Sequence, residues 1–180
     1  MALIDITYFI GERHIANVSS PSVAENIIDM IAIYEPELLE ALLGIDLYAD
    51  LLEGLEQDPI EARWTDLVDG TVFIYRGQKV RWIGLRNAQK RSPLADFVYF
   101  KYKADNVEHT VGAGNMQSNA ENGTIVSPMG KMVPAWNSMS ASLNTLFCFI
   151  ESRGLDYSSW TRPRSSFVKS LLNPVNSFNI

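Results

Sequence analysis

The first 70 residues carry apolar side chains at helical spacing, with short breaks between them. Ser19-Ser20-Pro21-Ser22 is typical of a helix start, because hydroxyl side chains cap the first turn and proline fits there. The apolar residues that follow recur every three to four positions: Val23, Ile27, Ile28, Ile31 and Ala32. Glu35-Pro36 predicts a break or a bend of the helix, since the residue before a proline disfavours the α conformation. We therefore expect short amphipathic helices over about 21–35, 38–43, 45–55 and 58–70.

Residues 71–84 change to the alternation of a β-strand. Val72 and Ile74, and then Val80 and Trp82, alternate with other residues on either side of Arg76-Gly77-Gln78. Glycine is frequent in tight hairpin turns, so the pattern predicts a two-stranded β-hairpin. Because an isolated hairpin is marginally stable in water, it is expected to pack on helices or on another subunit.

Two long helices are expected after the hairpin, over about 85–105 and 131–153, and Ser92-Pro93 either kinks the first or starts it afresh. Residues 106–130 between them are rich in Gly and Asn, as in functional or partner-ordered loops. The fold class predicted is mainly α: a helical bundle with one small β-hairpin, an extended loop and a C-terminal arm. We expect a helical domain over residues 1–154 and the arm over 155–180.

The arm has two prolines and widely spaced apolar side chains among basic ones. Such a segment is typical of docking on another surface rather than of a separate domain. The residues that we expect to bind a partner through the arm are Trp160, Arg162, Arg164, Phe167, Leu171, Leu172 and Phe178. The alternative is that the segment packs back on the helices of its own chain.

Charge is divided unevenly along the chain, whose formal net charge is −6. Residues 1–69 hold 15 acids and two arginines, a net charge of −13, whereas residues 70–180 hold six acids and 13 bases, a net charge of +7. This asymmetry fits head-to-tail association, an anionic partner, or simply one acidic and one basic face. The bases that we expect to line a DNA channel or to contact a subunit are Arg76, Lys79, Arg81, Arg86, Lys90 and Arg91.

Candidate chemistry is sparse. His14 and His109 lack neighbours at metal-ligand spacing, Cys148 between two phenylalanines is typical of an inert thiol, and Gly112-Ala113-Gly114 lacks the context of a phosphate loop. We predict a non-enzymatic protein without metal or cofactor. The single cysteine and the lack of a membrane-spanning apolar run predict synthesis in a reducing cytosol and no membrane association. Two alternatives remain: a DNA-binding regulator that uses the basic hairpin, and a small enzyme that uses His109 and a carboxylate.

Several motifs follow one another in a distinctive order. They are Tyr34-Glu-Pro-Glu-Leu-Leu39, Gly44-Ile-Asp-Leu-Tyr48, the hairpin from Val72 to Leu85, Asp96-Phe-Val-Tyr-Phe-Lys-Tyr102, Thr110-Val-Gly-Ala-Gly-Asn115 and Ala135-Trp136-Asn137. In this order they resemble the small helical head-tail connector (adaptor) proteins of crAss-like tailed phages. The resemblance covers residues 2–153, leaves the arm outside, and includes no catalytic motif.

The resemblance implies a structural virion protein at the head-tail interface. Connector proteins of this group form a ring, commonly twelve-fold, beneath the portal, where they extend the DNA channel and dock tail or further neck proteins. For this chain it implies a homo-oligomeric ring in contact with the portal protein and with tail or neck proteins. DNA would pass through the channel without sequence specificity. Residues 106–130 and 155–180 would be arms that gain order on assembly.

Overall fold

The protein is mainly helical and carries a two-stranded antiparallel hairpin, as predicted. The computed structural model describes residues 2–105, 109–111, 114–116 and 129–175. The helices are η1 (Ile6–Tyr8), η2 (Gly11–Arg13), α1 (Pro21–Leu43), α2 (Ile45–Leu55), α3 (Ala62–Asp69), α4 (Pro93–Asp105), α5 (Met129–Ser152) and α6 (Ser166–Leu171). The strands are β1 (Thr71–Tyr75), β2 (Gln78–Trp82), β3 (His109–Val111) and β4 (Gly114–Met116), paired as β1-β2 and β3-β4.

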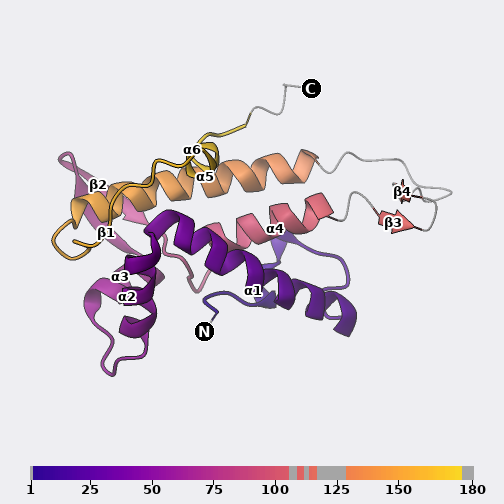
Figure 1. Ribbon diagram of the computed structural model, residues 1–180, viewed down its shortest axis with the longest axis horizontal. Helices are drawn as coiled ribbons and strands as arrows, with labels where there is room; N and C mark the ends of the chain where they lie inside the picture. The colour runs from indigo at the N-terminus through magenta and orange to yellow at the C-terminus, as the bar shows by residue number, and fades with distance from the viewer. Residues whose placement is uncertain (1, 106–108, 112–113, 117–128, 176–180) are drawn as a thin grey trace.

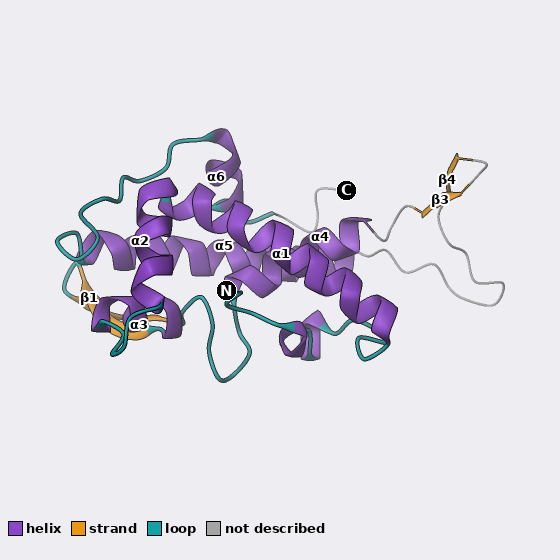
Figure 2. Ribbon diagram, turned by 60° about the horizontal axis from the view of Figure 1, so that its bottom comes forward, coloured by secondary structure: helices purple, strands orange, loops and turns teal. Residues whose placement is uncertain are grey.

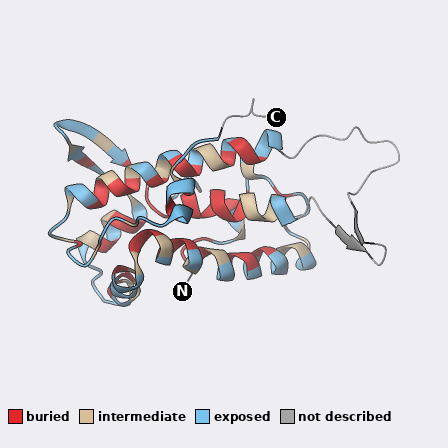
Figure 3. Ribbon diagram, turned by 45° about the horizontal axis from the view of Figure 1, so that its top comes forward, coloured by how far each residue is buried: buried red, intermediate tan, exposed pale blue. Residues whose placement is uncertain are grey.

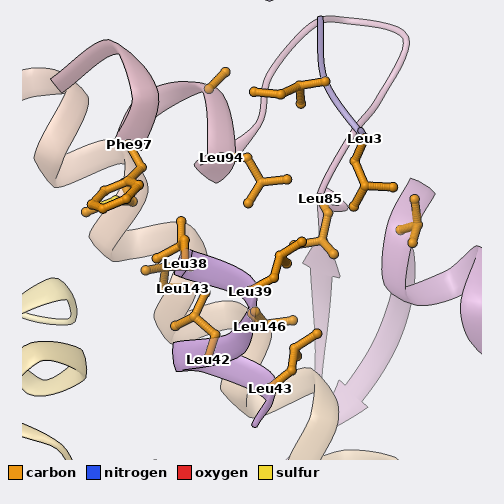
Figure 4. Close-up of a cluster of buried hydrophobic side chains, with 14 of the residues drawn as sticks. Leu3, Leu38, Leu39, Leu42, Leu43, Leu85, Leu94, Phe97, Leu143 and Leu146 are labelled. Atoms are coloured by element: carbon orange, nitrogen blue, oxygen red, sulfur yellow. The ribbon is translucent and has the colours of Figure 1, made fainter. Parts of the chain in front are cut away.

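Three long helices build the core, with α4 packed against both α1 and α5 (Figure 1). Helices α1 and α5 turn one face inward and leave the opposite face to solvent, whereas α4 is buried on all sides over residues 93–99 (Figure 3). Figure 4 shows the centre of this core, where leucines of α1 meet Leu94 and Phe97 of α4 and Leu143 and Leu146 of α5. These four side chains are at most 1% exposed, and burial of each contributes about 2 kcal/mol.

Helix α1 runs through Pro36 as one helix, so the prediction of a break at Glu35-Pro36 is wrong. The apolar residues on both sides of the proline share one face and are buried, which stabilises one continuous helix: Ile27, Ile31, Leu38 and Leu42. Pro36 has no N–H to donate to the carbonyl of Ala32. Because Ala32 lies on the exposed side, water can satisfy that carbonyl.

The helix before the Gly- and Asn-rich region starts afresh at Pro93, one of the two predicted outcomes. The hydroxyl of Ser92 accepts hydrogen bonds from the backbone N–H groups of Leu94 (3.1 Å) and Ala95 (3.4 Å) and so caps the helix. Residues 85–92 form a loop that Asn87 closes, by donating to the Ile83 carbonyl and accepting from the Arg91 N–H. The last long helix spans Met129–Ser152, within two residues of the prediction.

The hairpin packs its inner face on α5. Phe73 and Trp82 lie over the ring of Phe149, at centroid distances of 5.4 Å and 6.5 Å. At the tip, Arg76 and Gly77 both have positive φ (49° and 80°), which is the geometry of a two-residue type I′ turn. The hairpin is therefore held by α5 and, as predicted, does not depend on its own two strands alone.

The base of the hairpin is a close backbone crossing at Gly70 and Gly84. A Cβ on Gly70 would lie 2.5 Å from the carbonyl oxygen of Trp82, and one on Gly84 would lie 2.5 Å from that of Val68. Both glycines also have positive φ. The indole N–H of Trp82 donates to the Leu67 carbonyl at 2.8 Å, so the end of α3 and the hairpin form one rigid unit.

Candidate interaction surfaces

The outer face of the hairpin presents two apolar side chains opposite two bases. In the antiparallel register Val72 pairs with Arg81 and Ile74 pairs with Lys79, so all four lie on the same face. Val72 is 52% and Ile74 is 67% exposed. Among the described residues neither Lys79 nor Arg81 has an ion-pair partner, and Arg76 at the tip stacks its guanidinium on Tyr75.

The six predicted bases do not form one patch. Arg86 is paired with Asp69 at 2.8 Å beside the base of the hairpin, and the ammonium of Lys90 lies 4.6 Å from the Tyr8 ring centroid. Arg91 is exposed and lines a hollow at the base of the hairpin together with Arg81, as well as the cavity beside η2. The bases that remain free for a partner on the hairpin itself are thus Arg76, Lys79 and Arg81.

The exposed faces of α1 and α2 carry seven of the 15 acids of residues 1–69. They are Glu25, Asp29, Glu37, Glu40, Asp46, Asp50 and Glu53, and none forms an ion pair within the part of the chain that the structure describes. Ile28, Ile33 and Ile45 lie among them and are 52%, 61% and 76% exposed. This surface therefore mixes negative charge with apolar area, as the hairpin mixes positive charge with apolar area.

A cavity of about 540 Å³ lies between η2, the loop before α4 and the first turns of α4 and α5. On its wall Arg13 pairs with Asp96 at 2.5 Å, and the Ser138 hydroxyl donates to the same carboxylate at 2.8 Å. Burial raises the pKa of the Asp96 carboxyl, and the Arg13 guanidinium partly opposes this shift. The ion pair thus joins η2 to α4, and the hydrogen bond from Ser138 joins α5 to the same carboxylate.

Sequence reasoning missed the pairing of Arg13 with Asp96. The two residues are 83 positions apart, and no local pattern brings them together. One signal was present: Asp96 interrupts the apolar run Leu94-Ala95-Asp96-Phe97-Val98, where an acid must be buried and therefore paired.

The C-terminal segment, defined as residues 155–175, runs extended over 161–165 and lies on the protein's own helices (Figure 2). The indole N–H of Trp160 donates to the Leu42 carbonyl at 3.0 Å, and its ring centroid lies 5.5 Å from that of Phe147. Arg162 pairs with Glu151 at 2.6 Å. In the structure the segment thus packs on the helices of its own chain, which was the alternative to docking on a partner.

The end of the segment is held in the same way. Leu171 is fully buried together with Val168, Leu172 is half-buried and accepts from Asn144, and Phe167 is 37% exposed. Arg164 is exposed, and Phe178 lies outside the described residues. Partner binding through Leu171 would require its release, so Arg164 and Phe167 are the side chains of this set that a partner reaches most easily.

Metal-ligating side chains do not gather in the described part of the chain. No group of three or more His, Cys, Asp and Glu side chains there could hold a metal ion. The side chain of His109 lies outside the described residues, and Cys148 is half-buried on α5. Among the described helices, none combines the length and apolar character needed to cross a membrane.

Comparison of the chain with protein-family models, curated proteins and solved structures found no match.

Proposed function

We propose that this protein is a non-enzymatic structural protein of a tailed-phage virion, forming a homo-oligomeric ring between the portal and the tail. The observation that carries the proposal is the separation of unpaired charge. Acids on α1 and α2 and bases on the hairpin lack ion-pair partners within the described residues. Two different, complementary surfaces on one chain favour head-to-tail contacts, which close into a ring when the rotation per subunit allows it.

The place of the ring in the virion comes from the resemblance to connector proteins. The order of elements supports it: acidic helices α1 to α3, then the hairpin, then α4, which carries Asp96 to Tyr102. In this role the ring extends the DNA channel and gives tail or further neck proteins a docking surface. DNA passes through without sequence specificity, and the chain is made in the host cytoplasm before it joins the particle.

A DNA-binding regulator is the second candidate, because Arg76, Lys79 and Arg81 are exposed without ion-pair partners in the described part. Binding that depends on phosphate contacts weakens steeply with salt, roughly in proportion to the number of contacts. Titration of a DNA duplex at several salt concentrations tests this candidate, and a steep slope with a preferred sequence would favour it over the ring.

Mass spectrometry and electron cryo-microscopy of purified virions test the ring directly. We expect the chain in the neck, in a copy number that matches the symmetry of the portal or of the ring beneath it. Absence of the chain from purified particles would contradict the proposed function and would return the hairpin to consideration as a regulator's DNA contact.

A further inference from the structure

Helix α1 presents two parallel rows of exposed side chains in its first half. Glu25 and Asp29 form an acidic row, and Ile28 and Ala32 form an apolar row beside it. The members of each row are four residues apart, which places them on one helix face about 6 Å apart along the axis. Each row therefore repeats once per turn, with charge next to apolar surface.

The outer face of the hairpin presents two rows of the same kind with opposite charge. Val72 and Ile74 form an apolar row on β1, and Arg81 and Lys79 form a basic row on β2. Residues two apart on a strand are about 6.7 Å apart, close to the spacing of the rows on α1. Charge, apolar character and spacing thus match between the two surfaces.

The two surfaces lie at opposite ends of the molecule. Figure 1 shows the hairpin at one end of the long axis and the first turns of α1 at the other. α1 also turns its exposed face away from the helices with which it packs (Figure 3). One chain therefore cannot satisfy both surfaces by itself, whereas a second copy can.

We propose that the outer face of the hairpin of one copy docks along the first half of α1 of a second copy. Arg81 and Lys79 face Glu25 and Asp29, while Val72 and Ile74 cover Ile28 and Ala32. The apolar rows supply the buried area, and the charged rows set the direction of the contact. This inference rests on the proposed self-assembly and names the surfaces that would carry it.

A second copy fits the hairpin better than nucleic acid does. A phosphate backbone would neutralise Lys79 and Arg81, but it would leave Val72 and Ile74 against charged oxygens, without apolar partners. The face of α1 offers partners to both kinds of side chain. Because the contact joins different surfaces, it repeats from copy to copy in one direction, as a ring requires.

Charge-reversal variants of the full chain test the contact by sedimentation velocity at rising protein concentration, with folding checked by circular dichroism. Lys79→Glu/Arg81→Glu and Glu25→Lys/Asp29→Lys each bring like charges together. Each is expected to weaken self-association at least about tenfold. The chain with all four substitutions has opposite charges again, so its self-association is expected to recover.

Two control variants change net charge equally outside the contact. Glu56→Lys/Asp58→Lys lies just after α2, and Lys131→Glu/Lys169→Glu lies on α5 and α6, with all four side chains exposed. Both controls are expected to associate as the wild type does. Loss of association in either control, no recovery in the fourfold variant, or a wild type that stays monomeric at its highest soluble concentration overturns the contact.

The outcomes separate this contact from the proposed function. A chain found in the virion neck whose self-association ignores the four substitutions would overturn the contact and keep the function. A chain absent from virions whose association follows the charge swaps would do the reverse. Duplex DNA binding that Lys79→Glu/Arg81→Glu abolishes, with self-association unchanged, would assign the hairpin to nucleic acid and overturn the contact.

Discussion

The hairpin and the C-terminal segment were both predicted to meet a partner, and they differ in which side chains they leave exposed. The hairpin buries Phe73 and Trp82 on α5 and leaves Val72 and Ile74 exposed. The C-terminal segment buries Val168 and Leu171 on its own chain. A two-stranded hairpin on a helix covers one face, and alternation leaves the other free. An irregular segment with spaced apolar residues has no such rule, so its anchors serve its own chain as readily as a partner.

The largest expected effect comes from Gly84→Ala, which breaks the base of the hairpin. The new Cβ would lie 2.5 Å from the Val68 carbonyl oxygen, and φ at this residue is 88°. We expect a loss of about 2–5 kcal/mol in the free energy of unfolding, the sum of overpacking and left-handed strain. Urea unfolding of the purified variant measures it.

Gly77→Ala is the matched control for that experiment. Its φ is 80°, but nothing lies within 4 Å of a Cβ placed there. The strain alone costs about 1–2 kcal/mol. Equal losses of unfolding free energy in the two variants would show that the close backbone crossing at Gly84 adds no cost beyond the strain of a positive φ.

The next largest effect is expected for Leu171→Ala in the C-terminal segment. The side chain is fully buried, so its truncation should cost about 2–4 kcal/mol. Phe167→Ala removes a larger but 37% exposed side chain and should cost less. Urea unfolding and amide hydrogen exchange over 166–171 measure both. A loss for Leu171→Ala no greater than that for Phe167→Ala would mean that the segment is docked too loosely to count as part of the domain.

Local periodicity was enough to predict much of the fold. The hairpin and helices α2, α3 and α5 follow from residues within one element, since their side chains choose a face by spacing alone. Pro36 is the instructive failure. The local cost of a proline was known, but the burial of Leu38 and Leu42 beyond it depends on α4 and α5, which no window around Pro36 contains.

The sequence predicted only part of the candidate surfaces. The bases of the hairpin were named from the sequence, but the register that sets Arg81 and Lys79 opposite Val72 and Ile74 comes from the structure. Long-range contacts decided the rest: Arg86 found Asp69, and Trp160 found a carbonyl 118 residues away. Such contacts depend on the packed structure. The sequence can therefore name the candidate residues, but it cannot say which of them already have a partner within their own chain.

A smaller effect is expected for Trp160→Phe, which tests how the C-terminal segment begins. The substitution keeps an aromatic ring near Phe147 and removes the hydrogen bond from the indole N–H to the Leu42 carbonyl. Loss of one such bond costs about 1 kcal/mol in the free energy of unfolding. Trp136→Phe on α5 is the matched comparison. It removes the indole hydrogen bond to the carbonyl of Asn173, near the other end of the segment. Unchanged stability in both would mean that apolar burial alone holds the segment.

The smallest expected effect is a pH trend at the other chain end, which docks as the C-terminal segment does. The buried Glu35 carboxylate accepts from the N–H groups of Leu3 (2.7 Å) and Ile4 (3.3 Å). Burial raises the pKa of Glu35, and these hydrogen bonds oppose the shift without cancelling it. A carboxyl whose pKa is raised by folding stabilises most below its unfolded pKa, and this contribution is lost as pH rises through the folded value.

The unfolding free energy of the wild type minus that of Glu35→Gln should therefore fall from pH 4 towards neutral pH, because the wild type loses this stabilisation and the variant does not. Asp96, whose pKa burial also raises, shifts both chains in the same direction and drops out of the difference. Glu37→Gln removes an exposed carboxylate from the same helix and controls for the loss of an acid. Urea unfolding at each pH measures all three chains. A difference that grows with pH would mean that the hydrogen bonds to Leu3 and Ile4 outweigh burial, so that the N-terminal segment is held by an ionised Glu35.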